Sequence, residues 1–231
     1  MAMHSHIAQN LSNIKTRIAR AAERAGRDPH GIELVAVTKT RPLEQIQALI
    51  DAGQRVLGEN RVQEALPKIA ALRGQAEWHL IGHLQRNKAK TAVEGFALIH
   101  SADSDRLLES LSRAAQERGG MARVLIQVNI SEEGQKFGCE AAEAPRLLEL
   151  ADSLPGVRIE GLMGMAALAD DPEQARSAFR RLRELRDSLL AQGAPPERLR
   201  HLSMGMSHDF EIAVEEGSTL VRVGSALFHG L

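Results

Sequence analysis

The first residue whose type and position suggest chemistry is Lys39, which follows the apolar run Leu34–Val37 with only Thr38 between them. That run is short and rich in β-branched residues, as in a buried strand. A lysine that loses its water at the end of such a strand becomes an uncharged amine, the form that makes Schiff bases. A solvated lysine at the start of a loop gives the same pattern, so both interpretations of Lys39 stay open.

Two loops of small residues near the C-terminus have the composition of an anion site. Residues 203–207 read Ser-Met-Gly-Met-Ser and lead into an expected helix that Ser207 would cap, and Gly224-Ser225 begins another expected helical turn. Free backbone N–H groups and the helix dipole favour an anion there, and glycine allows close backbone approach. We expect a phosphate at these loops; the alternative is that Ser207 only caps its helix.

Arg222 is a third candidate, because it alternates with Val221 and Val223 inside an apolar run. Its side chain should therefore point to the opposite side of the strand from the two valines. A cation in such a place requires a partner or a ligand. A ligand contact and a structural ion pair with an acidic neighbour are both open.

Two other combinations are weaker. His79 and His83 have a zinc-like spacing, but they span the end of an expected strand, so their rings need not converge. Ser207, His208 and Asp209 are the residue types of a catalytic triad, but consecutive side chains cannot supply its hydrogen-bond geometry. We therefore expect no metal site and no triad.

The elements that must position these residues alternate regularly along the chain. A helix is expected within residues 1–30. Each of the first seven apolar runs is then followed by a helical pattern, and these expected helices span 43–52, 61–72, 85–93, 104–118, 141–153, 172–192 and 207–216. The apolar runs themselves are expected strands at 34–37, 55–57, 78–81, 97–100, 124–128, 157–162, 199–202 and 219–223.

Eight strand–helix alternations predict parallel strands with right-handed crossovers. Residues 33–231 leave about 25 residues for each unit, which fits a compact α/β fold of the (β/α)8 TIM-barrel type with an extra N-terminal helix. An open doubly wound sheet is the competing fold, but no G-x-G-x-x-G follows the first strand. We expect one domain over residues 1–231, with the N-terminal helix packed on the barrel. Its functional residues should lie at the carboxyl ends of the strands.

The composition argues against several classes of protein. Of the 231 residues, 43% are hydrophobic and 26% are charged, enough for a packed core. The net charge of −1 gives no basic field for nucleic acid, and five Phe, one Trp and no Tyr give few rings to stack bases. No run approaches the roughly 20 apolar residues of a membrane helix. Cys139 is the only cysteine, which excludes an intrachain disulfide. We expect a cytoplasmic monomer.

Several stretches together resemble the YggS/PROSC family of pyridoxal-phosphate-binding proteins, also called pyridoxal phosphate homeostasis proteins. The resemblance runs in order through almost the whole chain, so it is far more specific than any one motif. The matching stretches are Ala36-Val37-Thr38-Lys39, Gly58-Glu59-Asn60-Arg61-Val62-Gln63-Glu64, residues 79–88 (HLIGHLQRNK), Gly161-Leu162-Met163, residues 202–209 (LSMGMSHD) and Val221-Arg222-Val223-Gly224.

The resemblance implies a barrel like the N-terminal domain of alanine racemase, that is, a fold-type III pyridoxal-phosphate-binding protein. It also implies roles for six residues: the Schiff-base lysine is Lys39, the phosphate ligands are Ser207, Gly224 and Ser225, the residue against the pyridine nitrogen is Arg222, and the residue near the ring is Asn60. Two departures from the family are Ser225, where threonine is frequent, and the ending Phe228-His229-Gly230-Leu231, where relatives usually run Phe-Gly and continue.

The leading functional hypothesis is a non-catalytic protein that holds pyridoxal phosphate and hands it to apo-enzymes. Alanine racemases use a tyrosine from an added C-terminal domain of a partner subunit as a second base, whereas this chain has no Tyr and no residues left for such a domain. The first alternative is a pyridoxal-phosphate-dependent racemase or lyase, with His83 or His201 as the base. The second is an aldolase-type enzyme in which Lys39 and the anion site serve a phosphorylated sugar.

Overall fold

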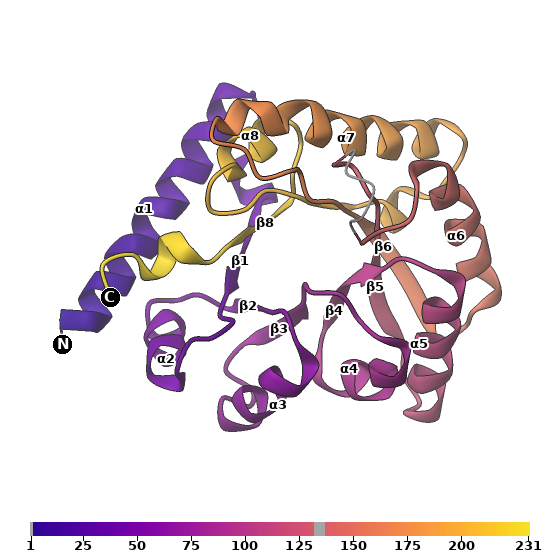
Figure 1. Ribbon diagram of the computed structural model, residues 1–231, viewed down its shortest axis with the longest axis horizontal. Helices are drawn as coiled ribbons and strands as arrows, with labels where there is room; N and C mark the ends of the chain where they lie inside the picture. Colours follow the sequence, from indigo (N-terminus) through magenta and orange to yellow (C-terminus); the bar gives the residue numbers. More distant parts are fainter. Residues whose placement is uncertain (1, 132–136) are drawn as a thin grey trace.

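The computed structural model describes residues 2–131 and 137–231. In that part of the chain, eight parallel strands close into a barrel in chain order, with β8 paired to β1 (Figure 1). The predicted barrel is thus confirmed. The strands are β1 (Glu33–Val37), β2 (Val56–Glu59), β3 (Glu77–Leu80), β4 (Leu98–Ala102), β5 (Ala122–Gln127), β6 (Val157–Met163), β7 (His201–Ser203) and β8 (Leu220–Val223).

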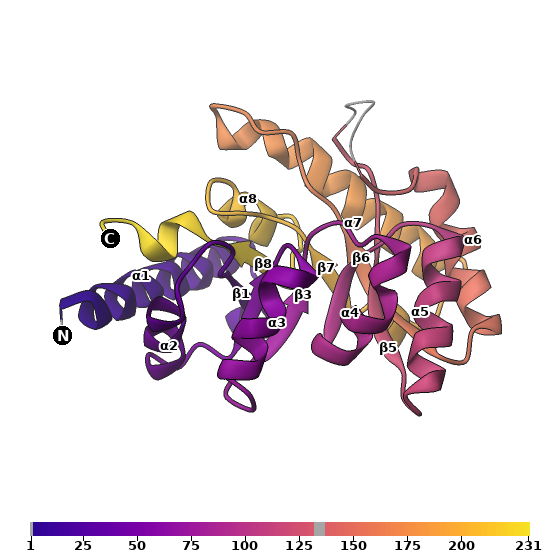
Figure 2. The ribbon, with the colours of Figure 1, turned by 60° about the horizontal axis from the view of Figure 1, so that its bottom comes forward.

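One helix precedes β1, and each strand except β8 is followed by an α-helix; these helices surround the barrel (Figures 1 and 2). The last α-helix, next to the candidate site, begins three residues later than predicted. The helices are α1 (Ala2–Arg24), α2 (Leu43–Asp51), α3 (Val62–Ala71), α4 (Ala89–Gly95), α5 (Asp105–Glu117), α6 (Ala144–Leu150), α7 (Arg176–Ala191) and α8 (Phe210–Glu215).

Alternation along the strands divides the apolar core into two parts. In β1, Leu34 and Ala36 belong to the large cluster that the helices share, whereas Val35 belongs to a smaller cluster. The smaller cluster collects one residue from each of six strands, which places it inside the barrel: Val35, Val56, Leu98, Leu125, Met163 and Leu220. Side chains therefore fill the barrel interior, as this fold requires, and a polar group there lies in apolar surroundings.

The N-terminal helix α1 packs against α2, α8 and the C-terminal 3-10 segment η7 (Ser225–Phe228). Its buried stripe repeats at Ile7, Leu11, Ile14 and Ile18, the spacing of one helix face. Each such side chain contributes about 1.5–3 kcal/mol when fully buried. The carbonyl oxygen of His229 accepts hydrogen bonds from α1, so the C-terminal end runs beside this helix (Figure 1).

Because the strands are parallel, the residues that follow them gather at one end of the barrel. Lys39 follows β1, Asn60 follows β2, and Gly224-Ser225 follows β8, so these residues come from three adjacent strands. Among the described residues, no helix has the length and apolar character needed to cross a bilayer.

Candidate functional site

Lys39 lies in a tight turn at the carboxyl end of β1, and its side chain is exposed. The Arg41 N–H donates to the Thr38 carbonyl oxygen at 3.1 Å, which closes the turn. Thr40, between them, has a φ of 61°, a left-handed conformation that is unfavourable for a β-branched residue. The Arg41 guanidinium lies 4.4 Å from the centre of the Phe228 ring, which helps to hold this turn next to the C-terminal segment.

A buried ion pair supports the base of the Lys39 turn. The Glu59 carboxylate is fully buried at the end of β2, and its Oε1 accepts hydrogen bonds from Lys68 Nζ and Thr38 Oγ1, each at 2.7 Å. Lys68 Nζ also donates to the Thr38 carbonyl oxygen at 2.8 Å. Sequence reasoning assigned no role to Glu59 or Lys68. The signal available was an acidic residue at the end of the apolar run that begins at Val56.

Asn60 stands next to this pair with an unused polar atom. Its side-chain Oδ1 is buried and has no hydrogen-bond partner. Gly82, at the end of β3, passes so close that a Cβ there would lie 2.2 Å from the Asn60 carbonyl oxygen. The backbone of Asn60 is therefore tightly confined, and its amide oxygen is an acceptor that a ligand would satisfy.

Two of the three predicted phosphate residues, Ser207 and Ser225, line one hollow of about 420 Å³. Ser207 and Ser225 form one side of it, and Asn13 and Arg17 of α1 form the other. The Ser207 Oγ accepts a hydrogen bond from the Gly224 N–H at 3.0 Å, which joins the loops after β7 and β8. Since a hydroxyl that accepts keeps its own proton, Ser207 remains a donor toward an anion.

The expectation that Ser207 caps a helix is wrong. The helix α8 begins at Phe210 and has six residues, and Asp209, not Ser207, accepts a hydrogen bond from the Met206 N–H at 2.6 Å. The loop reaches α8 through Gly205, whose φ is 92° and where a Cβ would lie 2.5 Å from the Ala213 Cβ. The Ser207 hydroxyl is thereby left to bind Gly224 instead of a helix end.

Arg222 points into the barrel, as its alternation with two valines predicts, and it is only 3% exposed. Its guanidinium donates to the Ser203 Oγ at 2.5 Å and to the Gly164 carbonyl oxygen at 3.1 Å. Burial lowers the pKa of Arg222 to about 10, with Asp209 acting in the opposite direction. At neutral pH the guanidinium is therefore still charged, and no described carboxylate lies within 4 Å of it.

The two histidines considered as bases are at opposite ends of the barrel. His83 follows β3 on the same end as Lys39, and its Nδ1 lies 3.6 Å from Asp103. His201 begins β7 at the other end, and burial lowers its pKa to about 4. His79 makes its contacts inside the barrel, so it does not share a site with His83. In residues 2–131 and 137–231, no group of three or more His, Cys, Asp or Glu is arranged to hold a metal.

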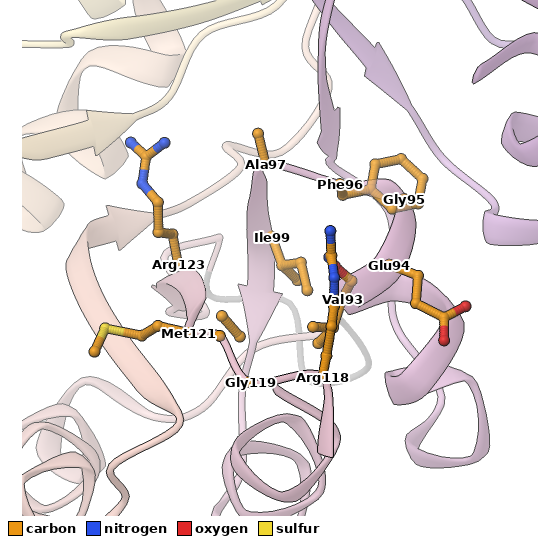
Figure 3. Close-up of a pocket in the computed structure, with 12 residues that line it drawn as sticks. Val93, Glu94, Gly95, Phe96, Ala97, Ile99, Arg118, Gly119, Met121 and Arg123 are labelled. Atoms are coloured by element: carbon orange, nitrogen blue, oxygen red, sulfur yellow. The ribbon is translucent and has the colours of Figure 1, made fainter. Parts of the chain in front are cut away.

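A second hollow, of about 560 Å³, lies away from these residues (Figure 3). Its lining includes Phe96 and Ala97 before β4 and Met121 at the start of β5, so it opens at the amino ends of the strands. Residues at this end of a TIM barrel serve stability more often than chemistry. Lys39 and the anion loops are on the other end.

Comparison with known proteins identifies the family. The alanine racemase N-terminal domain matches residues 9–231. A pyridoxal phosphate homeostasis protein of Aquifex aeolicus is 44% identical over 221 residues, which cover 95% of this chain and 96% of the relative. The chain belongs to the pyridoxal phosphate homeostasis protein family. A member from Pseudomonas aeruginosa is 40% identical over 97% of this chain and 95% of its own length.

A solved structure of a relative has the same fold. PipY of Synechococcus elongatus PCC7942, described with PLP bound, is 39% identical to this chain, with a TM-score of 0.83. The match covers 96% of this chain and 99% of PipY. This chain and PipY thus share one barrel fold, and the sequence match relates that barrel to the N-terminal domain of alanine racemase.

Proposed function

We propose that this chain binds pyridoxal phosphate as a Schiff base on Lys39 and serves in intracellular pyridoxal phosphate homeostasis, handing the cofactor to apo-enzymes without robust turnover. One observation carries the proposal: an exposed amine at Lys39 and an anion hollow at Ser207 lie at the same end of the barrel as the buried cation Arg222. A relative of similar fold is described with PLP bound, which supports the same ligand here.

The residues present fit this cofactor. When bound, the cofactor supplies an aldehyde that a primary amine attacks. The Lys39 amine makes that covalent bond, and the Ser207 hydroxyl, with the backbone of Gly224 and Ser225, holds the phosphate. The unpartnered Asn60 Oδ1 accepts a hydrogen bond near the ring. Arg222 would lie against the ring nitrogen.

A weaker electron sink at the ring and the lack of a tyrosine base together favour binding without robust turnover. A cation beside the ring nitrogen disfavours its protonation, and the ring is then a weaker electron sink than one paired with a carboxylate. A racemase with a lysine and a tyrosine as its two bases needs a tyrosine, and this chain has none. The site therefore suits retention and release of the cofactor.

Every residue assigned to the site lies on this chain. We propose that residues 1–231 act as one cofactor-binding domain, as a cytoplasmic monomer, with apo-enzymes as partners. The helix α1 belongs to that domain because it forms one wall of the anion hollow.

The transfer itself provides the decisive test. We expect the loaded protein to activate an apo-enzyme that depends on pyridoxal phosphate, with a matching loss of bound cofactor absorbance. The same experiment is repeated with a scavenger that traps free cofactor. Activation that persists with the scavenger indicates direct transfer, and activation that is lost indicates release into solution. A stable loaded protein that never activates an apo-enzyme would contradict the role in transfer while leaving cofactor binding intact.

The contact between His83 and Asp103 favours one second candidate, a racemase or lyase that acts on a small amino acid. A histidine beside a carboxylate at the Lys39 end has the composition of a general base. Incubation of the loaded protein with amino acids in D2O decides between the functions. Deuterium at the α-carbon would support the enzyme, and its absence across a panel of amino acids would remove it.

The Ser207 hydroxyl gives a quantitative prediction. The Ser207→Ala variant lacks one hydrogen bond to a charged phosphate, and such a bond contributes about 1.5–3 kcal/mol to binding. The Kd for pyridoxal phosphate should therefore rise by roughly 10–100-fold. Borohydride should still couple the cofactor to Lys39 at saturating concentration. Ser153→Ala, at an exposed serine outside the site, is the control for equilibrium dialysis of both variants. An unchanged Kd for Ser207→Ala would remove Ser207 from the phosphate site.

A further inference from the structure

A line of hydrogen bonds crosses the barrel interior and ends on Arg222. The Glu77 carboxylate Oε1 lies 3.1 Å from His79 Nε2, and His79 Nδ1 lies 3.1 Å from His100 Nε2. His100 Nδ1 lies 2.9 Å from Ser203 Oγ, which accepts a hydrogen bond from Arg222. Three polar side chains, one each from β3, β4 and β7, thus connect Arg222 to Glu77.

The interior members of this line are shielded from solvent. His100 and Ser203 are fully buried, and His79 is 4% exposed. The smaller apolar cluster inside the barrel, with one side chain from each of six strands, shares this interior with the line. Only Glu77, the first residue of β3, reaches solvent, at the amino ends of the strands. Arg123 lies 3.7 Å from Glu77 and stands on the wall of the amino-end hollow (Figure 3).

The donor and acceptor roles along the line follow from its two ends. An ionised Glu77 can only accept, so His79 donates from Nε2, and a neutral His79 then accepts at Nδ1. His100 must therefore donate from Nε2 and accept at Nδ1, from the Ser203 hydroxyl. Ser203 in turn accepts from Arg222. Every hydrogen bond points from Arg222 toward Glu77, and every member of the line is satisfied with both imidazoles neutral.

The charges around the line agree with this direction. Burial lowers the pKa of His100 well below its usual value, and His79, Arg222 and His201 lower it further. The hydrogen bond from His79 is the main cause that lowers the pKa of Glu77, followed by burial in the opposite direction and by the charges of His79 and Arg123, with Glu160 opposing. His100 therefore stays neutral, and Glu77 stays negative.

We propose that Glu77, His79, His100 and Ser203 are positioning residues for Arg222: they fix the orientation of its guanidinium and connect it to a remote counter-charge. The Arg222 guanidinium has no carboxylate in contact among residues 2–131 and 137–231, and a buried cation needs compensation. The aligned dipoles of Ser203, His100 and His79 supply this compensation, because each turns its acceptor atom toward Arg222. Glu77 keeps these dipoles aligned. The effect on the cofactor ring rests on the proposed function; the alignment does not.

The alignment can be tested in the ligand-free protein. Long-range 15N NMR distinguishes the two tautomers of each histidine and the imidazolium. At pH 7 we expect His79 and His100 to be neutral and protonated at Nε2. In Glu77→Gln, the new amide can donate to His79 Nε2, so both rings should move toward the Nδ1–H tautomer. An imidazolium at either ring, or tautomers that Glu77→Gln leaves unchanged, would overturn the proposal.

The effect on Arg222 has its own readout. Ser203→Ala removes the hydrogen bond that orients the guanidinium, so a ring nitrogen beside it should become more basic. We expect the pH titration of the absorbance of bound pyridoxal phosphate to shift upward by about one unit. Ser101→Ala, at a fully buried serine of β4 outside the line, is the matched control and should leave the titration in place.

The outcomes separate this proposal from the proposed function. A Ser203→Ala titration that coincides with the wild-type curve would show that the line does not act on Arg222, although the cofactor still binds. Failure of the wild-type protein to bind pyridoxal phosphate would refute the function and leave the tautomer result standing. Near-UV circular dichroism of each variant reports whether the barrel is intact.

Discussion

Borohydride treatment of the protein loaded with pyridoxal phosphate is expected to label Lys39 and no other lysine. Lys39 is exposed at the mouth of the barrel, and within residues 2–131 and 137–231 no hydrogen bond or ion pair holds its amine. Lys68, the other lysine that contacts this turn, is 14% exposed and bound to Glu59 and the Thr38 carbonyl oxygen. An amine held by both contacts is poorly placed to attack an aldehyde. Peptide mass mapping after reduction identifies the labelled residue.

Lys39→Ala should abolish that label and leave weak binding through the phosphate. Both the covalent bond and the phosphate contacts contribute to affinity for the cofactor. Only the covalent bond depends on Lys39. Lys90→Ala is the control, because Lys90 is exposed on α4 and lies 3.8 Å from Glu117. Equal trapping in the wild type and in Lys39→Ala, or a label on another lysine, would refute the assignment of Lys39.

The barrel could be predicted because its signals are local. Each strand is a short apolar run and each helix has its own periodicity, so alternation alone implies parallel strands. The same logic placed Lys39 and Arg222, since one follows an apolar run and the other alternates with Val221 and Val223. These positions depend only on where a strand lies and on which side each residue faces.

The contacts of those residues could not be predicted, because they join distant parts of the chain. Arg222 meets a hydroxyl and a carbonyl oxygen rather than an acidic neighbour. His100 gave no separate signal, yet two interior hydrogen bonds converge on it from β3 and β7. The register of a closed barrel decides which interior side chains are level with one another, and periodicity does not encode that register.

The error at Ser207 has a similar cause. Serine before an apolar run is a common helix cap, so the sequence favoured one. In the structure the chain turns through Gly205, Asp209 accepts from the Met206 N–H, and the Ser207 hydroxyl meets Gly224 from the next loop. A local preference for capping was overridden by a contact between two loops. That contact is also what turns two separate loops into one anion hollow.

The ion pair beneath Lys39 should carry the largest effect on stability. In Lys68→Met, the Glu59 carboxylate stays fully buried without its cation, and its Oε2 already has no hydrogen-bond partner. Removing one member of a buried pair typically costs about 3–5 kcal/mol of unfolding free energy. The Thr38 carbonyl oxygen also loses a donor, so the turn that carries Lys39 should loosen. Urea denaturation measures the loss.

The double variant Glu59→Gln/Lys68→Met separates the stranded charge from the lost packing. Because a neutral amide costs less to bury than an unpaired carboxylate, it should recover much of the stability that Lys68→Met loses. Arg61→Met breaks the exposed pair with Glu64 and should change stability by less than about 1 kcal/mol. If Lys68→Met is as mild as Arg61→Met, the pair does not support the turn, and the covalent chemistry at Lys39 depends on the strand end alone.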